Sequence, residues 1–358
     1  MNPDLEFIQR WAYQWKMVFN PDPTKQANEV IFSCKKNKPH HPALFFNGSY
    51  VTRVSEHKHL GLVLQNNLSF EKHLEEKMRK ANRVIGMLRH LTKFLPLKTL
   101  DQMYKSLVRS HFDYCDIIYH IPPNVSERGP VLPSLMEKVE KVQYSAALAI
   151  TGAWKGSSRL KIYEELGWES LSDRRLSRRI LQMHKIIDSE TADYLKEKLP
   201  PNRSPFLRYV FQNFRCKTDR YKNSFFPNAI SLWNEFITHF EDFPSYAVLR
   251  SHLHSFFRPK LKSIFGLNDK SGISVLFQLR LGLSSLKAHK KRHNFVDTPS
   301  AICECGQGIE TSNHFFVTCP LYAHIRAKFM DSVDDIFHKY NIIHPANSID
   351  VYLYGHPS

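Results

Sequence analysis

A run of three helical patterns between residues 69 and 150 constrains the fold of this chain most strongly. Ser69 begins the first helix, whose apolar stripe comprises Leu74, Met78, Ala81, Ile85 and Leu88. Pro96 suits the first turn of a second helix, which should run to about residue 119. A third is expected over residues 132–150. Three helices with short connections pack antiparallel, so the sequence predicts a three-helix bundle over residues 67–151.

Residues 1–66 are predicted to form a helix followed by a small β-meander. Bulky apolar residues line one face of residues 4–19, and the prolines at positions 21 and 23 end that helix because proline cannot continue its hydrogen-bond ladder. Asn47-Gly48 predicts a hairpin turn, since both residues tolerate a positive φ. The expected strands cover residues 30–33, 44–47, 50–54 and 60–64.

The remainder of the chain is expected to be helical, with a metal-binding segment near its end. Residues 152–298 include an apparently irregular linker from Pro200-Pro201 to Asn223, an aromatic-rich helix over 224–240 and helices around 276–286. Residues 299–358 should hold a zinc knuckle and a weakly periodic tail. The predicted fold class is therefore α+β, mainly α, in four parts: 1–66, 67–151, 152–298 and 299–358.

Positive charge narrows the choice of partners. The 358 residues include 50 Lys plus Arg against 34 Asp plus Glu, a net charge of +16. This excess favours polyanions, with nucleic acid ahead of an anionic membrane surface. No run approaches the roughly 18 apolar residues of a membrane span, the N-terminus lacks a signal-peptide pattern, and six cysteines are too sparse for a disulfide framework. We therefore expect an intracellular protein, cytoplasmic or nuclear, with RNA and DNA as partners and no membrane.

Two basic segments are candidate nucleic-acid contacts. If the apolar stripe of the first bundle helix faces the core, its basic residues must face solvent and meet phosphates; these are Lys72, Arg79, Lys80 and Arg83. A second basic run, Lys290, Lys291 and Arg292, precedes the last cysteines. Aromatic residues interleave with such charges, which suits single strands and heteroduplexes. The alternative is that the aromatics are core residues and the charges only solvated faces.

The sharpest local motif is a potential zinc site. Cys303, Cys305, His314 and Cys319 have the spacing C-x-C-x8-H-x4-C. Three thiolates and one imidazole complete a tetrahedral Zn²⁺ shell, which is typical of a structural site. Their ligand atoms should then lie about 4 Å apart, given Zn–S bonds of ~2.3 Å. A free-thiol loop with a core histidine is the alternative, and His289, His293 or His324 could replace one ligand.

Other candidate chemical groups are interpreted as ordinary helix surface. Asp113 and Asp116 are spaced to share a helix face, as are His111 and Cys115, but nothing nearby completes a metal site. Asp334-Asp335 sits in a helical pattern, where adjacent side chains point about 100° apart. The sequence contains no Walker loop, G-x-G-x-x-G, G-x-S-x-G or H-E-x-x-H motif.

An ordered set of segments along nearly the whole chain resembles the reverse transcriptases of non-LTR retrotransposons of the jockey-like kind. Residues 11–20 with Thr24-Lys25 are similar to the segment just after that family's catalytic loop. Residues 58–64, followed by 68–70, look like its primer grip leading into the thumb. Segments similar to its C-terminal region are 166–171 with Arg174-Arg175, 224–227 with 232–234, 279–282, and 303–320.

The resemblance implies an RNA-directed DNA polymerase, yet its catalytic carboxylates are missing here. The family needs an upstream aspartate and a Tyr/Phe-Ala-Asp-Asp turn, and no such tetrapeptide occurs. The expected parts are the end of the palm, the thumb and the zinc region, without fingers, most of the palm or the endonuclease. We expect no catalytic residue and no Mg²⁺ site. Lys25, which matches a lysine near the departing pyrophosphate, and Lys58 are nucleic-acid contacts implied by the resemblance.

Three hypotheses follow for function. The first is a C-terminal fragment of such a polymerase, left by a truncated or decayed element, which binds template-primer, target DNA or element RNA and is inactive alone. The second is a zinc-stapled basic helical interaction module without a polymerase role. The third is that another chain supplies the palm in trans. Reading the nucleotides upstream of Met1 would separate them.

Overall fold

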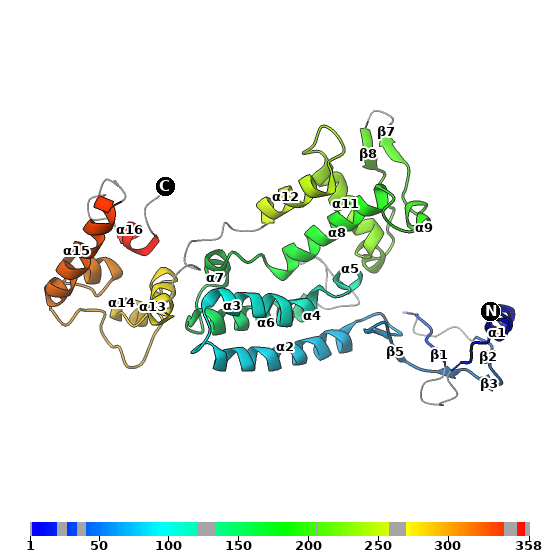
Figure 1. The fold of residues 1–358 in the computed structure, drawn as a ribbon, viewed down its shortest axis with the longest axis horizontal. Coiled ribbons are helices and arrows are strands. Elements are labelled where there is room, and N and C mark those ends of the chain that lie inside the picture. Colours follow the sequence, from blue (N-terminus) through cyan, green and yellow to red (C-terminus); the bar gives the residue numbers. More distant parts are fainter. Residues whose placement is uncertain are drawn as a thin grey trace. The chain divides into compact units, whose positions relative to one another are not determined.

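A computed structural model describes residues 2–19, 27–33, 41–119, 133–204, 207–257, 270–339 and 349–354 (Figure 1). Helices contain most of these residues, and the strands are short and paired. The predicted class, α+β and mainly α, is therefore confirmed. Among the helices in these ranges, none combines the length and the apolar character needed to cross a membrane.

The chain forms two compact units, each built from three separate stretches. The first unit comprises Met1–Asn82, Ser110–Lys141 and Leu171–His252. The second comprises Arg83–Arg109, Val142–Ser170 and Leu253–Ser358. The four-part division at residues 66, 151 and 298 remains a prediction, because these compact units group the chain by contact and not by sequence order.

The N-terminal strands form three small pairs in place of the single meander expected from the sequence. Helix α1 (Asn2–Gln14) precedes them. Within the described residues the antiparallel pairs are β2 (Phe45–Phe46) with β3 (Ser49–Tyr50) and β5 (Glu56–His59) with β6 (Leu62–Gln65), and the parallel pair is β1 (Asn28–Glu29) with β4 (Thr52–Arg53). The meander prediction was wrong, because these pairs are separate two-stranded sheets and one of them is parallel.

The backbone preferences of the turn residues explain why one hairpin was predictable from the sequence and the other was not. Asn47 and Gly48 have φ of 51° and 79°, so the predicted turn between β2 and β3 is confirmed. The turn between β5 and β6 uses Leu60 and Gly61, with φ of 45° and 84°. A leucine rarely adopts positive φ, so this second hairpin carried no clear signal, and strand β5 was not predicted.

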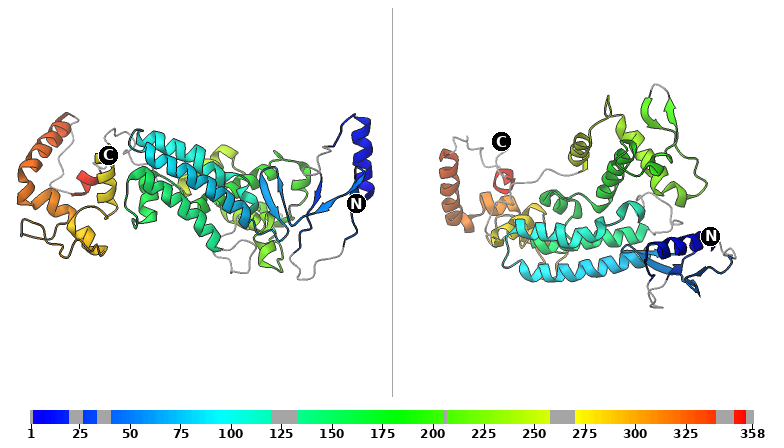
Figure 2. Two further views of the ribbon diagram at one scale, coloured as in Figure 1. Left: turned by 90° about the horizontal axis from the view of Figure 1, so that it is seen from below. Right: turned by 45° about the vertical axis from the view of Figure 1, so that its right-hand side comes forward.

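The central helices follow the predicted pattern with one interruption. Helix α2 (Glu71–Leu91) is one unbroken helix (Figures 1 and 2), and its stripe residues Leu74, Ala81, Ile85 and Leu88 are buried as expected. The second predicted helix is interrupted at Cys115, which has a φ of 56°. It consists of α3 (Leu97–Met103), a π-helical stretch (Tyr104–Arg109), α4 (Ser110–Asp113) and then α5 (Asp116–Tyr119). The third is α6 (Pro133–Thr151).

The predicted linker before residue 224 is in fact structured. Strands β7 (Asn202–Ser204) and β8 (Leu207–Phe211) form an antiparallel hairpin, and α10 (Asp219–Lys222) follows. The linker prediction was wrong because the pairing depends on a distant helix. Helices over the rest of the first unit are α8 (Leu171–Ile187), α9 (Asp193–Lys196), α11 (Phe225–Ile237) and most of α12 (Tyr246–Phe257).

The second unit ends in short helices around the cysteine cluster. Helix α7 (Arg159–Leu166) precedes them and ends at Gly167, which has a φ of 61°. The later helices are α13 (Lys270–Arg280), α14 (Lys287–Arg292), α15 (Ala323–Lys339) and α16 (Ile349–Tyr354). A π-helical turn (His314–Thr318) and a 3₁₀ turn (Pro320–Tyr322) separate the cysteine hairpin from α15.

The tryptophans of two later resembling segments, Trp168 and Trp233, belong to the core. Trp168 stacks on Tyr104, with ring centroids 3.9 Å apart, and its indole N–H donates to Asp101 Oδ1 at 2.7 Å. Trp233 donates to the Tyr209 carbonyl at 2.8 Å. Both tryptophans are almost fully buried. Trp168 therefore packs against the helical segment around Tyr104, Trp233 joins α11 to strand β8, and neither is exposed to a base.

Helix α8 carries four clustered arginines, of which Arg175 and Arg179 are buried and the other two, Arg174 and Arg178, are half-buried. Arg174 makes a bidentate ion pair with Asp113, at 2.7 and 2.9 Å, and Arg178 Nε lies 3.1 Å from Asp116 Oδ2. Arg179 is fully buried and donates to the Ile117 carbonyl at 3.0 Å. Asp113 and Asp116 are thus counter-ions for arginines, and the expectation of a plain helical face is corrected by this network.

Because helix α2 contains a buried histidine, we expect the folded chain to lose stability at acidic pH. His73 is fully buried, its Nδ1 accepts from the Val63 N–H at 3.4 Å, and burial, reinforced by Lys77, lowers its pKa to about 4 from 6.5. The unfolded chain therefore takes up the proton first as the pH falls. The stabilisation by neutral His73 is fully present above pH 6.5. Up to about 3 kcal/mol of the free energy of unfolding should be lost as the pH falls from there through 4. His73→Phe should remove this loss.

Urea unfolding at neutral and acidic pH measures the effect. His90→Gln, at an exposed position of the same helix, is the matched control and should keep the wild-type pH dependence. Equal pH dependence in wild type and His73→Phe would contradict the assignment.

Candidate metal centre

A short hairpin positions the first two cysteines. Ile302 bridges Ile309 across it, and the Cys303 N–H donates to the Gly308 carbonyl at 2.8 Å. Gly306 lies in the left-handed region, with φ of 75°, and its N–H donates to the Cys303 carbonyl at 3.0 Å. The chain therefore reverses immediately after the second cysteine, as a metal-wrapping turn requires.

The π-helical turn supplies the other two side chains. His314 begins this turn and Cys319 follows it, with the Cys319 N–H donating to the His314 carbonyl at 2.7 Å. A Cβ added to Gly308 would lie only 3.6 Å from His314 Nδ1. The imidazole therefore lies beside the hairpin at Gly308, at ordinary van der Waals distance.

The four predicted ligand atoms converge. All lie within 4.8 Å of one another, slightly wider than the expected separation of about 4 Å. The sulfurs of Cys303 and Cys319 are 3.7 Å apart, close to the edge of a tetrahedron with ~2.3 Å Zn–S bonds. Cys305 Sγ lies 3.2 Å from His314 Nε2. This group could hold a metal ion.

Neighbouring groups prepare two of the ligands for a metal. His314 Nδ1 lies 3.1 Å from Thr318 Oγ1. When Nδ1 carries the proton and donates it to this hydroxyl, the lone pair of Nε2 faces the sulfurs. This is the tautomer that a metal ligand needs. The Gln307 N–H donates to Cys305 Sγ at 3.4 Å and lowers the pKa of that thiol to about 7. A thiolate is the form that binds metal.

The alternative histidine ligands lie outside this group. His289 is buried, and its Nδ1 instead pairs with Ser284 Oγ at 2.8 Å. His293 and His324 do not belong to the converging set either. Of the residues considered from the sequence, the originally favoured four are the ones that the described structure brings together.

The basic face of α2 is exposed but partly neutralised. The side chains of Lys72, Arg79, Lys80 and Arg83 all reach solvent. However, Lys72 Nζ lies 2.6 Å from Glu56 Oε2, and Lys80 Nζ lies 2.7 Å from Glu76 Oε1. Lys58 also approaches Glu76, at 4.0 Å. Three predicted nucleic-acid contacts thus have carboxylate neighbours, a feature that helical spacing alone did not reveal.

The second basic run lies beside the cysteine hairpin. Lys291 and Arg292 are exposed on α14, whereas Lys290 Nζ lies 3.2 Å from Asp297 Oδ2. The Ala288 N–H donates to the Glu310 carbonyl at 3.3 Å, which joins α14 to the hairpin. Lys25, the remaining predicted contact, lies outside the described residues.

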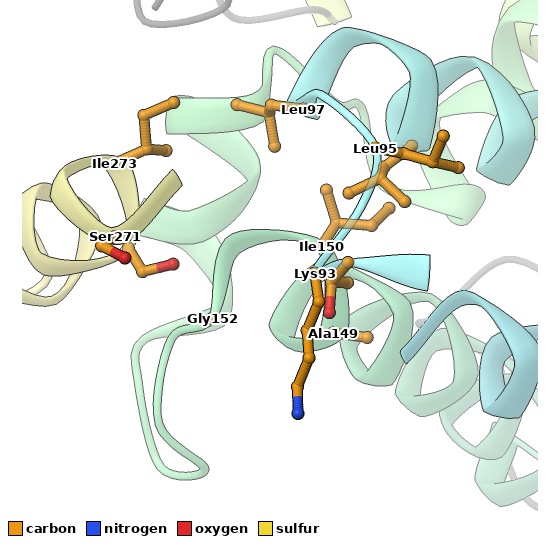
Figure 3. A pocket seen from close by; sticks show the side chains of 11 residues that line it. Lys93, Leu95, Leu97, Ala149, Ile150, Gly152, Ser271 and Ile273 are labelled. Carbon is orange, nitrogen blue, oxygen red and sulfur yellow. The ribbon is translucent and has the colours of Figure 1, made fainter. Parts of the chain in front are cut away.

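A cavity in the second unit was not anticipated from the sequence. It has a volume of about 460 Å³ and is lined mainly by apolar side chains such as Leu95, Ile150 and Ile273 (Figure 3). Lys93 is the charged residue of its lining. Gly152 at its edge accepts a hydrogen bond from Gln278 Nε2 at 3.0 Å. This lining brings no pair of acid–base groups together, so the cavity offers no evident catalytic chemistry.

Comparisons with known proteins give one informative similarity. No model of a known protein family matches the chain. The RNA-directed DNA polymerase from mobile element jockey of Drosophila funebris is 27% identical over 120 residues. Those residues are 33% of this chain and 13% of that polymerase, so the chain spans only a small part of its relative's length. Part of this chain is therefore similar in sequence to the RNA-directed DNA polymerase of a jockey retrotransposon.

Proposed function

We propose that this chain is the C-terminal part of a jockey-like reverse transcriptase, comprising the end of the palm, the thumb and a zinc region. The observation that carries the proposal is its similarity to the Drosophila funebris jockey polymerase. The ordered family-like segments and the net charge of +16 support it. In this role the chain binds template-primer or target nucleic acid, and its contacts are mainly to phosphates.

The metal centre has a structural role in this proposal. Zn²⁺ suits three thiolates and one imidazole, and a full shell leaves no position for substrate. Residues 303–319 are too few to bury a stable core alone, so Zn²⁺ would supply folding free energy. The exposed Lys291 and Arg292 on α14 would then be held beside a nucleic-acid strand.

The isolated chain is expected not to polymerise. Phosphoryl transfer by this family needs carboxylates that hold two metals, and the adjacent pair Asp334-Asp335 is exposed on α15. Successive residues of a helix diverge by about 100°, so this pair does not form such a site. Template-primer extension with Mg²⁺ and dNTPs should stay at background. Incorporation above that of a mock purification would refute the proposal that the chain lacks catalysis.

The exposed face of α2 gives a second prediction. Arg79→Ala should weaken binding to different nucleic-acid sequences equally and lower the salt slope of log K by about one, since one phosphate contact is lost. Fluorescence anisotropy at several salt concentrations measures both quantities. Lys198→Ala, at an exposed position after α9, is the matched control. Unchanged affinity and slope for Arg79→Ala would show that this face is only solvated.

The alternative is a zinc-stapled interaction module without a polymerase role. The ion pairs of Lys72 and Lys80 with Glu56 and Glu76 favour it, because paired lysines release fewer counter-ions on binding nucleic acid. The two functions differ in a simple measurement. The polymerase fragment should bind a template-primer with a strong salt dependence, whereas the interaction module should show no binding above that of an unrelated basic protein.

A further inference from the structure

We propose that a basic and aromatic surface on the first unit binds single-stranded nucleic acid. We call it the 214–222 surface, and its members are Phe214, Arg215, Lys217, Tyr221 and Lys222. It follows the β7–β8 hairpin in the chain (Figure 1). The inference rests on the proposed nucleic-acid function and names a contact surface that neither the sequence patterns nor the family resemblance assigned.

The charge of this segment is unusually one-sided. Between residues 203 and 222 the sequence has six basic residues and one acidic residue, Asp219. Arg215, Lys217 and Lys222 are exposed. On α2, by contrast, glutamates accompany the lysines at ion-pair distance. The 214–222 surface therefore presents more cationic charge per residue to a polyanion than α2 does.

Hydrogen bonds at both ends order this surface. The Asn234 side chain pairs with the backbone of Phe211, accepting from its N–H at 2.9 Å and donating to its carbonyl at 2.7 Å. At the other end, Arg220 Nη1 donates to the Asn67 carbonyl at 2.9 Å and Arg179 Nη1 to that of Asn223 at 3.3 Å. A segment held in this way loses little conformational entropy when it binds a ligand.

Short-range contacts complete the order of the surface. Thr218 caps α10 by accepting from the Tyr221 N–H at 3.2 Å. Arg220, which is partly buried, serves as the anchor, and burial lowers its pKa. The cations on either side of it, Lys217 and Lys222, remain exposed. Anchoring and ligand-facing roles thus fall on different residues of one short segment.

The aromatic ring pair on this surface favours single-stranded nucleic acid over other polyanions. Tyr221 is 46% exposed, and the half-buried Phe214 supports its ring edge-on, with centroids 6.1 Å apart. Unpaired bases stack on such rings, with phosphates neutralised by neighbouring cations. A duplex hides the faces of its bases, and a lipid headgroup has no base to stack. Single-stranded RNA or DNA therefore matches this surface best.

Anisotropy of a labelled single strand, titrated with the full chain at several salt concentrations, tests the proposal. The triple variant Arg215→Ala/Lys217→Ala/Lys222→Ala should lower the salt slope by about 2, since each single-strand phosphate contact contributes about 0.7. The same slope predicts roughly 100-fold weaker binding near 0.1 M salt. The control variant, Lys196→Ala/Lys198→Ala/Arg250→Ala, removes three exposed charges of the same unit and should bind like the wild type.

A second variant separates stacking from charge. Tyr221→Leu keeps the charge, so it should weaken single-strand binding about fivefold or more at an unchanged salt slope. Equal binding by the triple variant and its control would overturn the inference while leaving the proposed function intact. Absence of wild-type binding would overturn both. Loss of binding to phosphatidylserine vesicles in the triple variant, with Tyr221→Leu unaffected on every ligand, would identify a lipid surface and refute single-strand recognition.

Discussion

Replacement of Cys319 by serine is expected to abolish metal binding and to unfold the segment over residues 303–319. Cys319 is fully buried, and its sulfur lies 3.7 Å from that of Cys303. Structural Zn²⁺ sites contribute about 10–16 kcal/mol of apparent binding free energy that is also folding free energy. A serine in place of one thiolate removes a ligand from a shell that has no spare donor.

Metal analysis and amide hydrogen exchange test this expectation. The wild type should contain one Zn²⁺ per chain, and Cys319→Ser close to none, with rapid exchange of the amides of Cys303 and Gly306. Cys216→Ser is the matched control, because Cys216 is a half-buried free cysteine outside the cluster; it should keep the metal. A metal-free wild type with a protected hairpin would rule out the zinc assignment.

The neighbours of the ligands refine the same test. Thr318→Val removes the hydroxyl that lies 3.1 Å from His314 Nδ1. Loss of such an outer partner commonly weakens metal affinity by about 10–100-fold. In competition with a chelator, the metal affinity of the wild type should therefore exceed that of Thr318→Val, which in turn should exceed that of Cys319→Ser. An unchanged affinity in Thr318→Val would show that this hydroxyl does not orient the imidazole.

Arg280→Met is expected to destabilise the second unit by about 3–5 kcal/mol, the usual cost of breaking a buried ion pair. Arg280 Nη1 lies 2.8 Å from Glu165 Oε2, and the two side chains are only 8% and 5% exposed. Arg280 also donates to the Leu353 carbonyl and packs its guanidinium over Tyr354, 5.1 Å from the ring centroid. Its removal takes the guanidinium away from the buried Glu165 carboxylate.

The free energy of urea unfolding measures this loss. The double variant Arg280→Met/Glu165→Gln should recover part of it, because the buried carboxylate charge is removed as well. Lys287→Met removes a half-buried lysine that lies 3.3 Å from the exposed Glu304; it is the matched control and should cost less than about 1 kcal/mol. Equal small losses for Arg280→Met and Lys287→Met would contradict the buried role of the first pair.

Local spacing made several features predictable from the sequence. The stripe from Leu74 to Leu88 repeats with the period of a helix, so it specified both helix α2 and its buried face. Asn47-Gly48 specified a turn because of its own backbone preferences. The spacing of Cys303, Cys305, His314 and Cys319 named four ligands that do converge. Each of these signals lies within a few residues of the structure that it produces.

Features that depend on distant partners escaped prediction. No local sign in the sequence indicated the partners of Arg174 and Arg178 on α8, which are Asp113 and Asp116. The residues before 212 looked like a linker, but the Asn234 side chain fixes the end of β8. Local sequence patterns cannot identify either partner, since both are more than 20 positions away.

The sequence by itself therefore determined the helices, their buried stripes, one hairpin turn and the set of potential metal ligands. Only the tertiary structure decided which charges become internal counter-ions and which remain available to a ligand. The physical reason is that an arginine costs free energy when buried alone and little when a carboxylate meets it. That meeting depends on packing between helices, as the contrast between Arg174, which is paired with Asp113, and exposed Arg215 demonstrates.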